Sequence, residues 1–438
     1  MTNSLPRPGC QAGLTLIELM VAMLLGLLIS AGIVSLFIST SSANRVQTQL
    51  ATLQEEGRYA ITRLSGDLRM ANGFYCNNEG GEAGALSNGV LKLDKYLRAP
   101  KVYVPGATLS AALSDVTTVW GTGAYPAAPQ AAYAMPAFFS MRGYDCTTST
   151  CTPVDPKPNS TTMAKTANSR VPGTSVLTLR YLDPASGWAI NGTTTSVTNN
   201  GSGGVASLTI GQGTGEPAVP TAANYGGLLM LADCNSAQIF AATMSGSTFT
   251  PDGTVNFTGT TINPPSNFAP KVFDFKNNFV TVTYYLKVVS DNNGHTTGAL
   301  IRRVNGTDSE LVRGIERLDF RYGVMDANGN TRYLTAAQVD GTTSCPATEP
   351  NPLSSVGCLW RSVQSVEVHV LMDGQVPLYT LTANDMAYVY WGDTGDTAAV
   401  ASAPSDSSRK VMPSQQGFVD QMLRREFTAL ISVRNYNP

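Results

Sequence analysis

The feature that most constrains this chain is an uncharged stretch near its start, immediately preceded by an acid. From Leu19 to Ile38 no side chain is charged, and two serines are the only polar residues. As a helix, these twenty residues would be about 30 Å long, enough to cross the hydrocarbon core of a bilayer. Glu18 precedes the stretch, and a carboxylate carried to the centre of a membrane costs on the order of 2.5–3.5 kcal/mol. The sequence therefore predicts a membrane helix whose acid needs a partner.

Three kinds of N-terminal segment could contain such a stretch. A cleaved secretory signal has its small-residue cleavage site after the apolar run, whereas Gly13 lies before it. A plain signal anchor leaves Glu18 without a role. The third is a type IV prepilin: residues Gly13 to Glu18, G-L-T-L-I-E, resemble the G-[FML]-[ST]-L-[IVL]-E motif of that family. Motif and apolar run together favour this third interpretation.

The resemblance implies a processing and assembly chemistry. A prepilin peptidase would cut between Gly13 and Leu14 on the cytoplasmic face, and the new amine of Leu14 would be N-methylated. Glu18 would pair with the amine of a neighbouring subunit, because a charge in a low-dielectric setting is tolerable only when it is paired. Two details depart from the family pattern: the first mature residue is Leu14 rather than the commoner Phe, and Arg7 is the only basic residue of the leader.

The helix is expected to continue beyond the apolar stretch. Apolar or small residues recur at steps of three and four, and charged residues, Asp67 among them, lie between them; the stripe comprises Val46, Leu50, Leu53, Gly57, Ala60, Ile61, Leu64, Leu68 and Ala71. This spacing indicates one helical face, and Asn72-Gly73 is a good stop signal. Packing on the chain's own head is favoured over a coiled coil with a partner.

Further along, the pattern changes to strands. Residues 74–170 are rich in Gly, Ala, Pro, Ser and Thr and are expected to form a loop-rich surface insertion, with short strand candidates at 102–104 and 117–120. From 171 on, alternating or buried apolar runs predict strands and hairpins, and 419–435 is expected to form a short helix followed by a strand. Strands are predicted at 175–182, 226–233, 277–290, 299–305, 315–324 and 362–372. Loops are expected at 199–204 and 392–408.

These elements give a fold class and a division of the chain. The class is α+β: a long N-terminal helix, transmembrane and then amphipathic, packed on a β-rich, disulfide-stapled, pilin-like head. The division is a cleaved leader at 1–13, a transmembrane and filament-core helix at 14–38, its amphipathic second half at 39–73, the insertion at 74–170 and the β-rich head at 171–438.

The cysteines indicate export. Cys10 would be removed with the leader, which leaves an even set beyond the membrane span: Cys76, Cys146, Cys151, Cys234, Cys345 and Cys358. An even set in an exported protein predicts disulfides formed in an oxidising compartment. Sequence alone does not select among the 15 pairings; Cys146–Cys151 and Cys345–Cys358 are expected as local staples, which would leave Cys76–Cys234. A zinc site is disfavoured, because the chain has no C-x-x-C and only two histidines.

The sequence contains no recognisable catalytic or cofactor motif. It lacks H-E-x-x-H, G-x-S-x-G and the P-loop pattern, and His295 and His369 are expected to be solvated or packing residues. The acidic turns at 291–294 and 326–330 lack the spacing of a calcium loop. No cofactor or metal is therefore expected. A net charge of −2 gives no basic field for nucleic acid.

Stretches of the head extend the resemblance. Residues 311–329, 232–240 and the terminal R-R-E-F-T-A-L-I-S-V-R-N resemble the PilW family of type IV pilus minor pilins. That family implies a protein that primes pilus assembly, sits at or near the tip and supports adhesion and twitching motility. Implied partners are other minor pilins, a PilY-type tip adhesin, the major pilin and the inner-membrane assembly platform. Implied locations are the inner membrane, with one pass and the head in the periplasm, and then the pilus on the cell surface.

Two alternatives remain. The helix and the stretch R-G-I-E-R-L-D-F-R-Y-G also resemble the J-type minor pseudopilin of type II secretion, although the length of this chain favours PilW. A signal-anchored periplasmic enzyme or binding protein is the other alternative, and the missing catalytic constellations argue against the enzyme.

Overall fold

The structure, a computed structural model, describes most of the chain. It covers residues 13, 15–75, 83–87, 90–93, 99–123, 125–233, 236–253, 261–265, 269–290, 294–325, 330–341, 356–395 and 397–435, with backbone only at 83–87, 90–93 and 325. The chain divides into two compact units, Met1–Thr52 and Leu53–Pro438.

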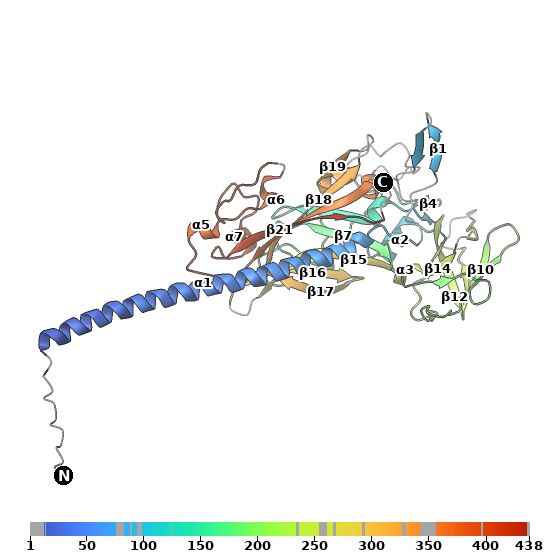
Figure 1. The fold of residues 1–438 in the computed structure, drawn as a ribbon. Helices are drawn as coiled ribbons and strands as arrows, with labels where there is room; N and C mark the ends of the chain where they lie inside the picture. Colours follow the sequence, from blue (N-terminus) through green and yellow to red (C-terminus); the bar gives the residue numbers. More distant parts are fainter. Residues whose placement is uncertain are drawn as a thin grey trace, which may run out of the picture. The chain divides into compact units, whose positions relative to one another are not determined.

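The long helix α1 runs without interruption over Leu16–Met70 (Figure 1). Its part within the second unit buries a stripe consisting of Leu53, Gly57, Ala60, Leu64, Asp67 and Leu68. The predicted packing of this part on the chain's own head is confirmed, since the apolar members belong to the main core of the head. Asp67 differs from the prediction, because it lies within the buried stripe and not on the polar face.

The end of α1 is fixed by residues from the far end of the chain. Asn72 has a left-handed backbone, with φ of 61°, as expected for a residue just past a helix C-terminus. Asn435 Nδ2 donates to the carbonyls of Met70 and Ala71 at 3.0 and 3.1 Å. The predicted stop is thus confirmed, and a C-terminal side chain satisfies two carbonyls that the helix leaves open.

A six-stranded sheet lies beside the buried half of α1. Its strand order is β17-β16-β15-β7-β5-β6, and neighbouring strands are antiparallel. The strands are β5 Met141–Cys146, β6 Cys151–Thr152, β7 Val176–Leu182, β15 Phe279–Ser290, β16 Thr296–Val304 and β17 Thr307–Arg313. One face of this sheet contributes to the main core that α1 completes.

A second, larger sheet lies next to the C-terminal end of α1, where Tyr75 contacts Phe273 of its strand β14. Its main path is β8-β14-β11-β12-β13-β10-β9, with β3 on β12 and β4 on β3. The strands are β3 Lys101–Val102, β4 Tyr133–Ala134, β8 Trp188–Ala189, β9 Ser196–Asn199, β10 Val205–Thr209, β11 Leu228–Ala232, β12 Ala237–Ser245, β13 Thr248–Pro251 and β14 Lys271–Asp274. All five residues of β11 are buried, because Leu228 and Met230 face the main core while Leu229 and Leu231 face a separate one. We call residues 188–274 the second lobe.

The remaining strands form a four-stranded sheet and an isolated pair. The four-stranded order is β19-β18-β20-β21; its strands are β18 Ile315–Met325, β19 Thr331–Leu334, β20 Val363–Asp373 and β21 Arg424–Ser432, and the pair is β1 Ala83–Ser87 with β2 Val90–Leu93. Short helices occupy the connections: α2 Gly106–Ala112, η1 Ala137–Phe139, η2 Pro158–Ser160, α3 Phe275–Asn278, α4 Ala336–Gly341, η4 Cys358–Ser362, α5 Ala383–Met386, α6 Trp391–Thr394 and α7 Pro413–Gln416. The expected class, a long helix on a β-rich head, is confirmed.

Three local predictions differ from the structure. Residues 117–120 form no strand. Part of the expected surface insertion is core, because Val104, Phe139 and Met141 are fully buried. Residues 419–423 are not helical; the Arg424 guanidinium donates to the carbonyls of Val419, Asp420 and Met422 in the conformation that they adopt instead.

The disulfide predictions are tested in part. The structure contains the predicted Cys146–Cys151 bridge, which closes the β5–β6 hairpin. Cys358 is also disulfide-bonded, to a partner outside the described residues. Cys10, Cys76, Cys234 and Cys345 lie outside them as well, so Cys345–Cys358 and Cys76–Cys234 stay predictions.

Candidate functional site

The prepilin-like motif forms the first turn of α1. Glu18 Oε2 accepts hydrogen bonds from Thr15 N at 3.0 Å and Thr15 Oγ1 at 2.9 Å, and Glu18 N donates to Thr15 Oγ1 at 3.3 Å. This is a capping box, in which two residues reciprocally satisfy open amides of a helix start. Gly13, the predicted cleavage residue, is exposed, and Leu14 lies outside the described residues. Within a single chain, the carboxylate of Glu18 therefore already has a neutral partner.

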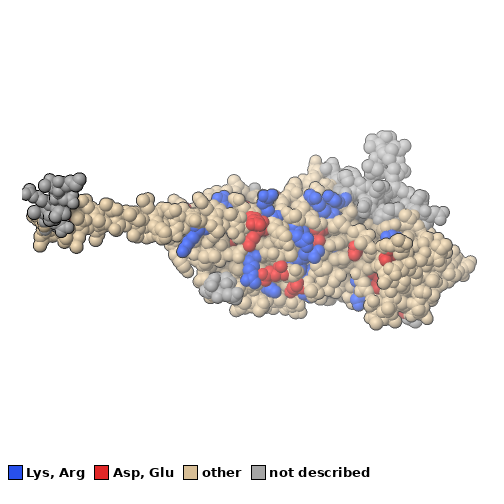
Figure 2. Space-filling view, turned by 60° about the horizontal axis from the view of Figure 1, so that its bottom comes forward, with Lys and Arg blue, Asp and Glu red and all other residues tan. Residues whose placement is uncertain are grey.

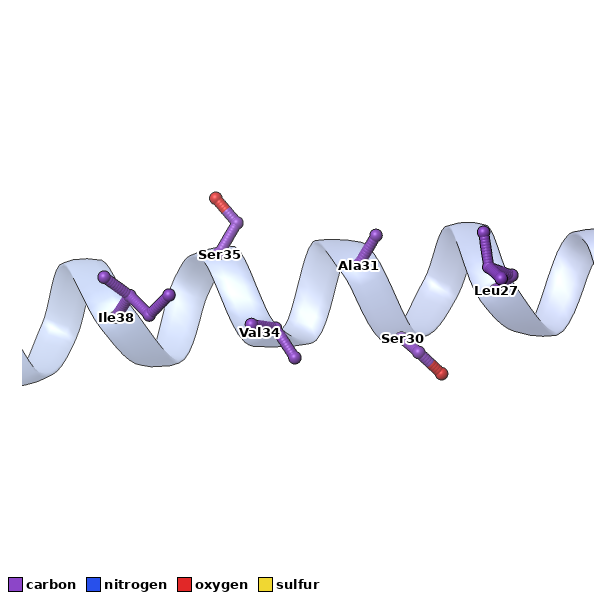
Figure 3. Close-up of a pocket in the computed structure, with 6 residues that line it drawn as sticks. All are labelled: Leu27, Ser30, Ala31, Val34, Ser35 and Ile38. Atoms are coloured by element: carbon purple, nitrogen blue, oxygen red, sulfur yellow. The ribbon is translucent and has the colours of Figure 1, made fainter.

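The first half of α1 presents apolar side chains to its surroundings. Within the described residues, α1 is the one helix long and apolar enough to cross a membrane. A shallow depression on it is lined by Leu27, Ser30, Ala31, Val34, Ser35 and Ile38. In Figure 3, Leu27, Ala31 and Ser35 follow one edge of the helix, and Ser30 and Val34 follow another. The depression is thus open helix surface, suited to lipid or to another helix and not to an enclosed ligand.

A polar clamp fastens the second half of α1 to the six-stranded sheet. Arg302 donates to Asp67 through Nε at 2.6 Å and Nη2 at 3.0 Å. Tyr284 and Tyr181 donate to the same carboxylate at 2.6 and 3.2 Å. Burial raises the pKa of Asp67, but the hydrogen bonds from Arg302 and Tyr284 outweigh burial and hold the pKa below its ordinary value. The clamp joins α1 to β16, β15 and β7 at one point.

Two further contacts fasten α1 nearer the start of the second unit. Glu56 Oε2 accepts a hydrogen bond from Gln375 Nε2 at 2.5 Å. Gly57 lies so close to Phe427 of β21 that a Cβ on Gly57 would be 2.7 Å from its ring. Together with the Asp67 clamp, these contacts bind α1 to two different sheets at two points about three turns apart.

Buried ion pairs hold the long connection between β20 and β21. Asp393 accepts from Arg317 Nη1 at 3.0 Å and from Arg409 Nη1 at 2.8 Å, and both arginines are buried. Arg424 donates to both carboxylate oxygens of Glu316, at 2.7 and 2.9 Å. The segment 392–408, expected as an exposed loop, is therefore anchored at Asp393 and at Arg409 just beyond its end.

The remaining candidates for a chemical site are His369 and the acidic groups among the described residues. His369 is buried, accepts or donates through Nδ1 to Glu426 Oε1 at 2.9 Å and stacks on Trp391, as expected of a packing residue. Among the described residues, no group of three His, Cys, Asp or Glu could hold a metal ion; both acidic turns extend beyond those residues. Figure 2 shows charges of both signs interspersed on the middle of the head.

The sequence contained signals for two site features that we did not predict. Thr15 and Glu18 match the S/T-x-x-E pattern of a capping box. Asp67 stands three residues after Leu64 and four before Ala71, which is the spacing of the buried stripe. The identity of its partners could not be read from sequence, because Tyr181, Tyr284 and Arg302 are far away along the chain.

Comparisons with known proteins bear on both ends of the chain. A family described as type IV pilus-assembly protein W (PilW) matches residues 283–435, which run from β15 through β21. The prokaryotic N-terminal methylation motif matches residues 9–34. The stretch 232–240, also predicted to resemble PilW, lies outside the matched ranges. No curated protein and no solved structure matches the chain. The methylation motif on an exposed apolar helix and the PilW match over strands that hold the second half of that helix together support a PilW-like pilin related to the type IV pilus.

Proposed function

We propose that this protein is a minor pilin that primes type IV pilus assembly and occupies the tip or a position near it. Its first thirteen residues would be removed by the prepilin peptidase between Gly13 and Leu14. Its partners would be other minor pilins, a PilY-type adhesin, the major pilin and the assembly platform. The observation that carries the proposal is the motif of Thr15 and Glu18 at the head of an apolar helix whose second half is clamped to a large β-rich head.

Glu18 would set the register of the subunit, that is, its position along the filament relative to its neighbours. In the single chain its carboxylate accepts hydrogen bonds only from Thr15 within the described residues, and these are bonds from neutral groups. A cationic amine on a neighbouring subunit would provide a stronger, charge-assisted bond. In a low-dielectric bundle of helices an unpaired carboxylate is penalised, so a subunit shifted out of register would be disfavoured.

The second lobe supports a position at the tip. The ring of Tyr75, just past the end of α1, lies 5.3 Å from that of Phe273 on β14, so the lobe begins where α1 ends. In Figure 1, β10, β12 and β14 extend beyond that end of the helix. In a filament of parallel helices, the head of the next subunit along the axis would have to occupy the region that the second lobe fills. A subunit at the tip has no further subunit beyond it, so this steric overlap does not arise there.

The test separates the charge of Glu18 from its capping role. Cells would carry wild type, Glu18→Gln or Thr15→Ala, and sheared surface fibres would be probed for the protein. We expect Thr15→Ala to enter fibres, because it retains the carboxylate while losing the capping hydroxyl. Glu18→Gln is expected to be processed but absent from fibres. Equal loss in both variants would indicate a capping role only, and wild-type entry of Glu18→Gln would refute the register role.

Two controls complete the test. Intact mass of the membrane form should show a chain that begins at methylated Leu14 in all three proteins; a retained Met1 would refute processing. Deletion of the protein should abolish twitching motility. Loss of type II secretion with normal twitching would instead support the J-type pseudopilin alternative.

A further inference from the structure

The six-stranded sheet has a second face, opposite the one that binds α1. Side chains alternate between the faces of a strand, so on β7 Tyr181 points to the Asp67 clamp while Arg180 points away from it. On β15 Tyr284 points to the clamp, and Thr281 and Thr283 point away. This outer face forms the floor of a cleft of about 700 Å³.

A buried cation lies in the floor of this cleft. Arg180 is 3% exposed; its Nε donates to Thr281 Oγ1 and its Nη1 to the carbonyl of Phe139, both at 3.1 Å. Nη2 has no hydrogen-bond partner in the described part of the chain, and no carboxylate of that part lies within ion-pair distance of the guanidinium. The carboxylate of Asp115 compensates this charge through space, without a hydrogen bond to the guanidinium. Nη2 is therefore the part of Arg180 that an incoming anion could bind.

The two acids of the cleft are already engaged. Asp115 accepts hydrogen bonds from Thr117 Oγ1 at 2.7 Å and from the amide of Thr118 at 3.2 Å. Asp155 is paired with Arg170 at 2.7 Å. Asp155 is thus neutralised by Arg170, whereas Asp115 keeps its charge and offsets part of that of Arg180. Neither carboxylate occupies Arg180 Nη2.

The rim adds two free cations and several neutral polar groups. Lys157 and Lys276 are exposed, and their ammonium groups form no ion pair with the described residues. Arg303, also on the rim, is held by Asp308 at 2.8 Å. Neutral hydroxyl and amide groups also line the cleft, among them those of Thr178, Thr281, Thr283, Asn159, Asn277 and Asn305. Several are hydrogen-bonded within the chain, such as Thr178 to Thr283 at 2.9 Å and Asn277 Nδ2 to the carbonyl of Asn224 at 2.7 Å, and their oxygens keep lone pairs that can accept from sugar hydroxyls.

We propose that this cleft binds an acidic saccharide of the uronate type. One carboxylate would lie on Arg180 Nη2, with the sugar hydroxyls on the threonines and asparagines. Lys157 and Lys276 would attract further carboxylates of a polyuronate chain. The combination of cations with many hydroxyl and amide groups favours this class over a simple anion. Binding by the head would not depend on assembly into a fibre.

The test uses purified full-length protein in detergent and trigalacturonate as the probe, measured by titration calorimetry at low and moderate salt. We expect binding that weakens with salt, and at least tenfold weaker binding of the neutral trisaccharide galactotriose. The double variant Lys157→Gln/Lys276→Gln should lose about tenfold in affinity. Lys410→Gln, an exposed lysine outside the cleft lining, should bind as wild type.

Arg180→Lys tests the floor of the cleft, and its thermal unfolding shows whether the variant is folded. If it is unfolded, the double lysine variant still decides the outcome. Absence of trigalacturonate binding at millimolar concentration would overturn the proposal, as would equal affinity for galactotriose or an unchanged affinity in the double lysine variant. Equal or tighter binding of triglutamate would show that an acidic peptide is the ligand class, which would also overturn it.

Discussion

Asp67 of the helix and Arg302 of β16, 235 residues apart in sequence, form a two-point ion pair with N–O distances of 2.6 and 3.0 Å. Both side chains are largely buried, with 13% and 18% exposure. The pair fixes the rotation of α1 about its axis, because only one helical position can present a carboxylate to Arg302, Tyr284 and Tyr181 together.

Asp67→Asn should destabilise the head. The amide keeps the shape of the side chain but leaves Arg302 as a buried charge without its partner, which costs about 3 kcal/mol. Urea unfolding of the full chain in detergent would measure the loss. Glu55→Gln, an exposed acid on the same helix, should change stability by less than about 0.5 kcal/mol. Equal effects of the two substitutions would show that the clamp contributes little.

The stabilising effect of Asp67 should depend on pH. Its folded-state pKa lies below the ordinary value of 3.8, so the carboxylate stabilises the fold above about pH 3.8 and this effect is lost as the pH falls through the folded pKa. The difference in urea midpoint between wild type and Asp67→Asn should be constant from pH 7 to about 5 and shrink below about 4. Parallel profiles down to pH 3 would contradict the assignment.

Substitution by alanine should have opposite effects on stability at two glycines of α1. At Gly57 a Cβ would lie 2.7 Å from the Phe427 ring, so Gly57→Ala should destabilise the head by about 1–3 kcal/mol through overpacking. At Gly66 a Cβ would meet nothing within 4 Å, so Gly66→Ala should stabilise the helix by up to about 1 kcal/mol. Thermal unfolding of the two variants gives the comparison. A stabilised Gly57→Ala would mean that α1 can move away from β21.

Loss of Asp393 should release the connection between β20 and β21. Asp393→Ala leaves Arg317 without one of its two carboxylates and Arg409 without an ion pair. Limited proteolysis should then cut within residues 397–412 at least tenfold faster than in wild type, while the rest of the head stays intact. Asp406→Ala is the control, because Asp406 is only partly buried and its carboxylate accepts hydrogen bonds from the neighbouring Ser408 without a salt bridge to the described residues. Unchanged cleavage of Asp393→Ala would show that packing alone holds the segment.

Much of the fold could be predicted because its signals are local. The period-2 runs at β7, β15, β18 and β20 were found within a few residues of their bounds, as was the end of α1 at Asn72. One local signal was missed: Asn305-Gly306, both with positive φ, forms the tight turn between β16 and β17, which is a typical hairpin sequence. The strands at the start of the head were harder to predict from sequence. The strands β3 and β4 have only two residues each, and they are strands because they pair with the larger sheet.

The sequence by itself determined the apolar helix, the prepilin-like motif of Gly13 and Glu18, the length of α1 and most of the strands of the head. These are properties of neighbouring residues, and periodicity and composition encode them directly. Only the tertiary structure decided that Asp67 is buried, that residues 419–423 are non-helical and hydrogen-bonded to Arg424, and that Arg180 lies in a cleft. Each of these depends on partners up to hundreds of residues away, and the free energy of a buried charge is set by those partners and not by its neighbours in the chain.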